Sequence, residues 1–352
     1  MKKALCLFNM VIILFTSVFL FPDSGITAYA EGKAVNIVID PGHGGAGGTR
    51  PGAQYNGLTE KELTLKVANA LKAELEKYDN VNVYMTRTTD TEVTLEQRAE
   101  YAKSVNADFL FSVHFNASAD HIFYGSEVWT SPFGSFYQAG YNFGQIVSNE
   151  WSTLGLYQKG VKSKVGKTGR DYYGILKHCV ARNIPGVILE HAYLDHVYDV
   201  SMVKTENFLN QLGVADATAI AKYFKLKSSK TGADYSGYTY ESVKKPSSAV
   251  YQDTTEPDVC DIKVLSYDTE SGNVLVEMTT KDKQSPVIYF CYSFNGGTYY
   301  SLLQMWDRTK ETQSFNVKVP SGTVNPVIVC RSYNNYEKGA QSNAVTVEAS
   351  FK

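Results

Sequence analysis

The fold is decided by the stretch VNIVIDPGHGG at residues 35–45. Its apolar, β-branched beginning predicts a buried strand. The strand ends at Asp-Pro-Gly, where His43 follows among glycines. Open α/β sheets hold their ligands at the carboxyl ends of strands, and glycines allow a sharp turn beside the imidazole. This stretch therefore predicts an α/β fold with a functional histidine at a strand end.

Three later fragments carry polar side chains that complement His43. They are LTE at 58–60, FSVHFN at 111–116 and VILE at 187–190. The last two indicate apolar strands with a metal-binding side chain at or near the end. Either His43 or His114 alone would more often be structural, but two imidazoles, one carboxylate and a second carboxylate as base suit zinc hydrolysis. We therefore predict a zinc site.

Helix capping separates the two glutamates that compete for the ligand role. Thr59 and Glu62 have the spacing of a capping box, in which Glu62 binds the backbone of Thr59. Glu60 then takes the first helical position, from which it can reach the strand ends. We therefore predict Glu60 as the metal ligand. The same spacing predicts a structural capping box at Thr94 and Gln97.

Glu190 follows three apolar residues of a strand that is expected to be buried, where a carboxylate without a function is not expected. Burying an ionised acid without a partner is costly, so its pKa is expected to be raised. Such a group suits a general base that later passes the proton to the leaving amine. The alternative is a salt bridge to a core arginine, Arg87 or Arg98, which we rate lower.

Alternating strand and helix patterns continue to about Leu226. We expect strands at 35–40, 81–86, 108–114, 125–130 and 186–190, and helices at 61–77, 95–104, 136–154 and 208–224. This order predicts a three-layer α/β/α open sheet, largely parallel, with helices on both faces. The first domain is expected to span residues 31–227.

The pattern changes twice after the first domain. Residues 228–256 are rich in Ser, Thr, Gly, Lys, Pro and Tyr without apolar period, which predicts a flexible linker. From 257 to 352, seven short alternating segments predict an all-β immunoglobulin-like sandwich. They lie at 258–266, 273–279, 287–294, 298–303, 313–319, 327–333 and 344–347. The endings at 329–334 and 342–347 resemble the last two strands of a fibronectin type III module.

Residues 1–30 have the features of a secretory signal peptide. Two lysines precede a mostly apolar run, and Ala28-Tyr29-Ala30 has the small-x-small pattern of a cleavage site. An uncleaved membrane anchor is the alternative, but the cleavage site favours removal. No stable membrane span is expected after cleavage.

The charge and cysteine content of the chain argue against nucleic-acid-binding proteins and against a cysteine zinc site. The chain has 34 Lys and Arg against 36 Asp and Glu, with no basic stripe, which argues against nucleic-acid binding. Four cysteines follow the leader, at Cys179, Cys260, Cys291 and Cys330, and their spacing fits no zinc knuckle. We expect buried free thiols, with one bridge at most.

The fragments together resemble the zinc-dependent N-acetylmuramoyl-L-alanine amidases of the amidase-3 type. The resemblance runs in order from about residue 35 to 224, through VIDPGHGG (38–45), LTEK (58–61), TRxxD (86–90), LExR (95–98), SVHFN (112–116) and ILEH (188–191). It implies hydrolysis of the amide between N-acetylmuramic acid and L-alanine in peptidoglycan. It also implies Zn²⁺ held by His43, Glu60 and His114, with Glu190 catalytic.

One residue departs from the family pattern. Many relatives have Gly-Phe after the catalytic glutamate, whereas His191 follows Glu190 here. Because neighbouring strand residues point to opposite faces, we expect His191 to be packed rather than catalytic. The remaining histidines, His121, His178 and His196, lack ligand spacing.

Two rival functions remain, of which the first would use the same four residues and the second is disfavoured because all four positions are filled. One is a zinc peptidase that cuts within the stem peptide, and the other is a wall-binding protein with an inactive amidase fold. The resemblance implies a secreted protein, extracellular or attached to a bacterial cell wall, that acts on peptidoglycan.

The C-terminal domain has no predicted chemistry. Exposed aromatics are expected to contact wall polymers or a protein partner, unless the domain is a passive spacer. These aromatics are Tyr299, Tyr300, Trp306, Tyr333 and Tyr336. Truncation after Leu226 is therefore expected to leave cleavage of soluble fragments intact.

Overall fold

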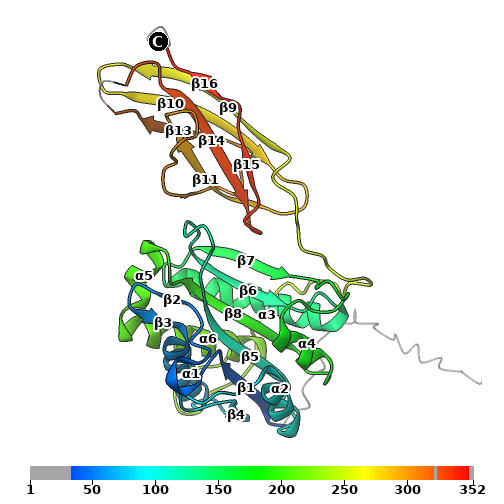
Figure 1. The fold of residues 1–352 in the computed structure, drawn as a ribbon. Helices are drawn as coiled ribbons and strands as arrows, with labels where there is room; N and C mark the ends of the chain where they lie inside the picture. Colours follow the sequence, from blue (N-terminus) through cyan, green and yellow to red (C-terminus); the bar gives the residue numbers. More distant parts are fainter. Residues whose placement is uncertain (1–32, 321–322, 349–352) are drawn as a thin grey trace, which may run out of the picture.

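The computed structural model describes residues 33–320 and 323–348. The N-terminal region, residues 33–227, is built around a six-stranded sheet (Figure 1). Its order is β4 (Val81–Met85), β1 (Val35–Pro41), β5 (Phe109–Asn116), β8 (Gly186–Tyr193), β6 (Ser126–Thr130) and β7 (Gln158–Ser163). The predicted signal peptide, residues 1–30, lies outside the described residues. No helix among the residues described is long and apolar enough to cross a membrane.

Helices cover both faces of this sheet, which confirms the predicted open α/β fold. One face packs against α1 (Glu60–Leu75), α3 (Gly134–Thr153) and α6 (Glu206–Tyr223). The other packs against α2 (Leu95–Ser104) and α4 (Gly174–Val180). The short helix α5 (Val197–Val203) follows β8. Since both faces are covered, the central strands are almost continuously apolar, as in other buried parallel sheets.

The sheet departs from the prediction at one edge. Strands β4, β1, β5 and β8 are parallel, but β6 runs antiparallel to β8. The edge strand β7, with the sequence QKGVKS, was not predicted. Its buried positions include Lys159 and Lys162, so it lacks the apolar pattern on which strand prediction depends.

The two predicted capping boxes have different outcomes. Thr94 and Gln97 form the reciprocal pair that begins α2, as predicted. Thr59 makes no side-chain capping bond at α1, and Glu62 is exposed, so that prediction is wrong. Instead, the N–H groups of Glu60 and Lys61 donate to carbonyls of the preceding loop. The loop thus satisfies two of the four free N–H groups at the start of the helix.

The C-terminal region, residues 257–348, contains only strands. One sheet has the order β13 (Thr312–Lys318), β10 (Asn273–Lys281), β9 (Val259–Asp268), all antiparallel. The second has the order β12 (Gln304–Met305), β11 (Val287–Ser293), β14 (Val327–Asn334), β15 (Gly339–Gln341), with β16 (Val345–Thr346) also on β14. Residues 298–303 form no strand, contrary to prediction. The four described cysteines are buried and free.

The segment between the regions lies against the N-terminal region along α3 and β7. Gln138 Nε2 donates to the carbonyl of Val243 at 2.8 Å, and Ser163 Oγ donates to that of Val250 at 2.8 Å. Three of its tyrosines, Tyr235, Tyr238 and Tyr240, pack against the sheet core. The segment is therefore not the flexible linker that its composition predicted. It has no apolar periodicity, but single tyrosines and hydrogen bonds hold it against the N-terminal region.

The C-terminal region contacts the N-terminal region beside β6 and β7 (Figure 1). A shared apolar cluster joins Phe123, Tyr124 and Tyr193 to Ile288, Tyr289, Cys291 and Leu303. Most of the aromatic side chains predicted to be exposed are instead packed or hydrogen-bonded within the protein. Trp306 is buried in the C-terminal core, Tyr333 packs on Phe123 and Tyr336 bonds Ser163, so Tyr299 is the member of that set left largely exposed.

Candidate metal centre and catalytic glutamate

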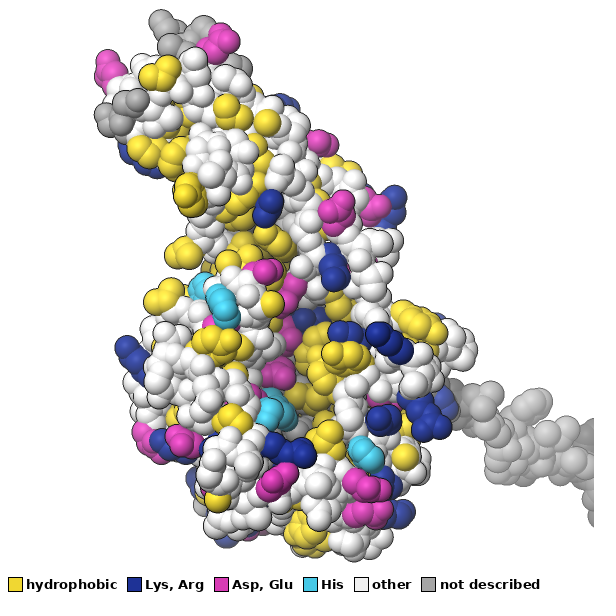
Figure 2. All heavy atoms as spheres, viewed as in Figure 1, with side chains coloured by type: hydrophobic (Ala, Val, Ile, Leu, Met, Phe, Trp, Pro, Cys, Tyr) yellow, Lys and Arg dark blue, Asp and Glu magenta, His cyan; other side chains and the backbone are white. Residues whose placement is uncertain are grey.

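The three predicted ligands come from different elements and meet at one end of the sheet. His43 lies just after β1, Glu60 is the first residue of α1, and His114 lies near the end of strand β5. Alternation along β5 places His114 on the α2/α4 face, beyond the helices that cover its other end. The two histidines are therefore partly exposed on that face, whereas Glu60 is buried behind them. A histidine and acidic groups lie in a furrow of this face (Figure 2).

The distances among these side chains suit a single ion. Glu60 Oε1 lies 2.8 Å from His114 Nδ1, and Glu60 Oε2 lies 3.1 Å from His43 Nε2. All three donor atoms lie within 4.8 Å of one another. Burial raises the pKa of Glu60, but hydrogen bonds and charge from the two histidines outweigh it and lower the pKa to about 2. An anionic oxygen and two imidazoles are a typical zinc donor set.

Two glycines leave the space that these side chains occupy. A Cβ on Gly42 would lie 2.3 Å from Cε1 of His114, and a Cβ on Gly52 would lie 2.3 Å from Oε2 of Glu60. Gly52 also has a positive φ of 72°. Any larger residue at either position would displace a ligand.

Two buried arginines hold the loop that carries His43. Arg87 donates to the carbonyls of Pro41 and Gly42 at 2.9 and 2.8 Å. Arg98 pairs with Asp40 at 2.6 Å and donates to the carbonyl of His43. Burial raises the pKa of Asp40, but the Arg98 charge and three hydrogen bonds outweigh it, so the pKa is lowered. Both arginines are thus engaged away from Glu190, which removes the alternative of a salt bridge there.

Glu190 lies beside the three candidate metal ligands. Strand register places it opposite His114 on β5 and opposite Glu127 on β6. Its Oε2 atom is buried and has no hydrogen-bond partner among the described residues. Burial, followed by the charges of Glu60 and Glu127, raises the pKa of Glu190 well above 4.5. A carboxyl group with a raised pKa takes up a proton more readily than an ordinary glutamate, which suits proton transfer.

His191 points to the opposite face of the sheet, as predicted. It is fully buried, contacts the carbonyl of His114 through Nδ1 at 3.2 Å and pairs with Asp216 through Nε2 at 2.9 Å. It therefore supports β5 from behind. His121 and His196 are engaged elsewhere, with Asp195 and with the start of α5.

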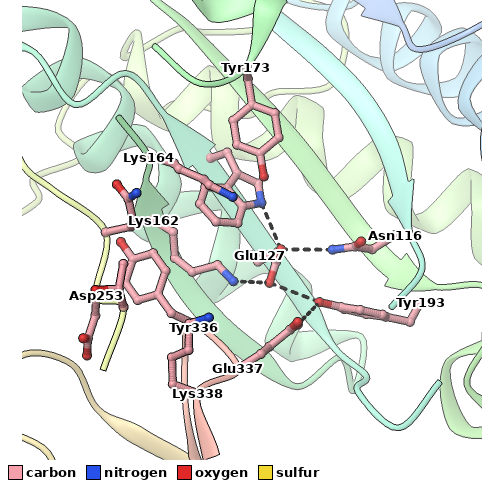
Figure 3. Close-up of a pocket in the computed structure, with 13 residues that line it drawn as sticks. Asn116, Glu127, Lys162, Lys164, Tyr173, Tyr193, Asp253, Tyr336, Glu337 and Lys338 are labelled. Carbon is pink, nitrogen blue, oxygen red and sulfur yellow. Dashed lines mark hydrogen bonds and ion pairs between the residues drawn. The ribbon is translucent and has the colours of Figure 1, made fainter. Parts of the chain in front are cut away.

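A second polar cluster, which no sequence pattern indicated, lies next to Glu190. Glu127 accepts from Asn116, Trp129 and Lys162 at 3.0, 2.9 and 2.5 Å, and Lys159 lies 3.1 Å away (Figure 3). Burial raises the pKa of Glu127, but the two lysine charges lower it to about 2. Its only sequence signal was a glutamate inside a short strand, which is too common to be informative.

Comparison with known proteins agrees with this geometry. The family model described as N-acetylmuramoyl-L-alanine amidase matches residues 37–222, more than half of the chain. The chain belongs to this amidase family. Its enzymatic class is therefore an amidohydrolase with N-acetylmuramoyl-L-alanine amidase activity, acting on peptidoglycan.

Named amidases are among the relatives of the chain. A sporulation-specific N-acetylmuramoyl-L-alanine amidase of Bacillus subtilis is 31% identical over 211 residues, 57% of this chain and 72% of the relative. The amidase CwlM of Bacillus licheniformis is 31% identical over 199 residues, 54% and 70% of the two chains. The crystal structure of an amidase from Clostridium difficile 630 is 25% identical, with a TM-score of 0.48 over 54% of this chain and 97% of that chain.

Proposed function

We propose that this amidase binds one zinc ion through His43, Glu60 and His114 and uses Glu190 as its catalytic acid and base. The observation that carries the proposal is the meeting of three donor atoms within 4.8 Å beside a buried carboxyl oxygen without a partner. Gly42 and Gly52 support it, because both leave the room that the ligands need.

The proposed reaction divides the work between the metal and Glu190. When bound, zinc would polarise the amide carbonyl and acidify water. Glu190 accepts the proton of the water whose oxygen bonds to the carbonyl carbon. The bond from that carbon to the nitrogen of L-alanine then breaks, and Glu190 gives the proton to this nitrogen as it leaves. Its raised pKa suits both roles, since the same group must take up and release a proton.

Metal content and turnover separate the two roles. Purified protein should hold about one zinc per chain. Glu60→Gln should lose metal, whereas Glu62→Gln, an exposed neighbour on the same helix, should not. Glu190→Gln should keep zinc and lose about 100-fold or more of kcat, since it removes the base alone. Metal analysis and mass spectrometry of digested peptidoglycan give the readouts.

Two results would contradict this assignment. The first is metal loss in Glu62→Gln with none in Glu60→Gln. The second is a product peptide cut within the stem, since an amidase releases a peptide that begins with L-alanine.

We further propose that residues 1–30 export the protein to the bacterial cell wall and that residues 257–352 are an immunoglobulin-like or fibronectin type III sandwich. The leader pattern supports export. The two antiparallel sheets share one apolar core, which includes Val276, Phe290 and Cys330, and this supports the sandwich.

A further inference from the structure

A pocket of about 290 Å³ lies between the two regions, next to Glu190. The N-terminal region contributes Asn116, Glu127, Trp129, Lys162, Lys164, Tyr173 and Tyr193, and the segment from 252 and the C-terminal region contribute Gln252, Asp253, Thr254, Tyr336, Glu337 and Lys338 (Figure 3). Asn116 is two residues beyond His114 on β5, and Glu127 is the register partner of Glu190. Two residues of the pocket are therefore neighbours of His114 and Glu190 in the sheet.

The walls of this pocket are held in place by bonds across the interface. Glu337 pairs with the fully buried Lys159 and accepts from the Tyr193 hydroxyl at 2.6 Å. Lys162 Nζ donates to the carbonyl of Asn335 at 2.9 Å, and the Tyr336 hydroxyl donates to the carbonyl of Ser163 at 3.2 Å. The turn from 334 to 338 is therefore a fixed wall of the pocket.

Two of the lysines that line the pocket take no part in an ion pair among the described residues. Glu127 and Glu337 are neutralised by Lys159 and Lys162. Asp253 accepts from Thr255, Ser285 and Asn334. Lys338 and Lys164 also line the pocket, and neither ammonium group has an anionic partner among the described residues. The ammonium nitrogen of Lys164 lies 3.8 Å from the Tyr172 ring centroid.

On the other side of the candidate metal ligands, the cationic side chains are paired with acidic residues. A second pocket of about 310 Å³ is lined by His43, His114, Val93 and Leu95, together with Arg50 and Arg98. Arg50 pairs with Glu92 at 2.7 Å and Arg98 with Asp40, so both cations there are neutralised. The unpaired positive charge thus lies on one side of the catalytic residues only.

We propose that the pocket between the two regions binds the peptide part of the substrate, with Lys164 and Lys338 holding its carboxylate groups. This rests on the proposed function. The muramoyl carboxyl group is consumed in the scissile amide, so the carboxylates of the substrate lie on the peptide side. A free carboxylate is the ligand that two unpaired ammonium groups favour. The C-terminal region thereby becomes part of the substrate site.

Binding of product peptides tests the subsite without relying on turnover. The probes are an L-alanyl tripeptide with a free C-terminal carboxylate and the same peptide as its carboxamide, titrated calorimetrically into the full-length protein. Lys338→Ala and Lys164→Ala should each weaken binding of the free acid by about ten-fold and leave the carboxamide unchanged. Lys338→Arg should retain binding. Lys318→Ala, an exposed lysine on β13 outside the pocket, is the matched control.

Each outcome decides one question. Equal affinity of the two peptides for wild-type protein, or equal weakening of both by Lys338→Ala, overturns the subsite even if the protein cleaves the muramoyl amide. Lysine-dependent binding of the free acid supports the subsite, and if that protein fails to cleave the amide, the proposed function alone is wrong.

Discussion

At the scale of single residues, the state of Glu190 decides the chemistry. Its carboxyl group is flanked by Glu60 and Glu127, both of which stay ionised because cations or imidazoles stabilise them. Burial and these charges raise the pKa of Glu190. The same row of three register partners, His114, Glu190 and Glu127, therefore joins the proposed ligand, the proposed proton carrier and a charge that raises its pKa.

This arrangement predicts the pH dependence of turnover. Glu190 must be ionised to accept a proton, so kcat/KM should fall as pH drops through its raised pKa. Glu127→Gln removes one charge that raises this pKa and frees two lysine charges that lower it. The acidic limb of the profile should therefore move to lower pH. A limb that stays in place, in a variant with native zinc content, would show that Glu127 does not act on Glu190.

At the scale of elements, the loop from β1 to α1 positions two of the three proposed metal ligands, His43 and Glu60. It places His43 at a positive φ of 59° and presents Gly52 against Glu60 and His43. The carbonyls of Pro51 and Ala53 accept the first N–H groups of α1, so this loop also sets the start of the helix. Ligand geometry and helix capping depend on the same few residues.

Two glycines of this loop separate steric from conformational effects. Gly52 and Gly57 have φ values of 72° and 75°, but only Gly52 has neighbours that a Cβ would strike. Gly52→Ala and Gly57→Ala should each lose about 1 kcal/mol of stability or somewhat more from the strained backbone. Only Gly52→Ala should also lose zinc and activity. Equal zinc content in the two variants would argue against close packing of Gly52 on the ligands.

At the scale of the whole molecule, the C-terminal region is attached through buried charge as well as apolar contact. Lys159 has no exposed surface and depends on Glu127 and Glu337 for charge balance. Burying a lysine without such partners is costly. Truncation after Leu226 would remove Glu337 and uncover the shared aromatic cluster. The expectation of an intact truncated enzyme is therefore replaced by one of reduced stability.

A single substitution measures this attachment. Glu337→Ala leaves Lys159 with one carboxylate and should lower the free energy of unfolding by about 1–3 kcal/mol. Glu270→Ala, an exposed glutamate in a turn of the same region, should change it by less than about 0.5 kcal/mol. Denaturant titration of the two full-length variants provides the comparison. Similar midpoints would mean that the ion pair does not hold the regions together.

Sequence patterns alone predicted the open α/β sheet, which the structure confirms, and singled out His43, Glu60, His114 and Glu190 as candidate site residues. These signals are local, because an apolar strand and the polar residue at its end are neighbours in the chain. The position of Glu60 could be inferred even though the capping argument for Glu62 was wrong, since the loop replaced the cap.

Only the tertiary structure decided the antiparallel edge, the buried lysines of β7 and the pocket between the regions. Lys159 and Glu337 are 178 residues apart, and neither has a chain neighbour that indicates the other. A buried lysine resembles an exposed one in the sequence, because its burial depends on a partner supplied by a distant element. The proposed catalytic residues could therefore be predicted from strand ends, whereas the pocket beside them depends on how the two regions pack.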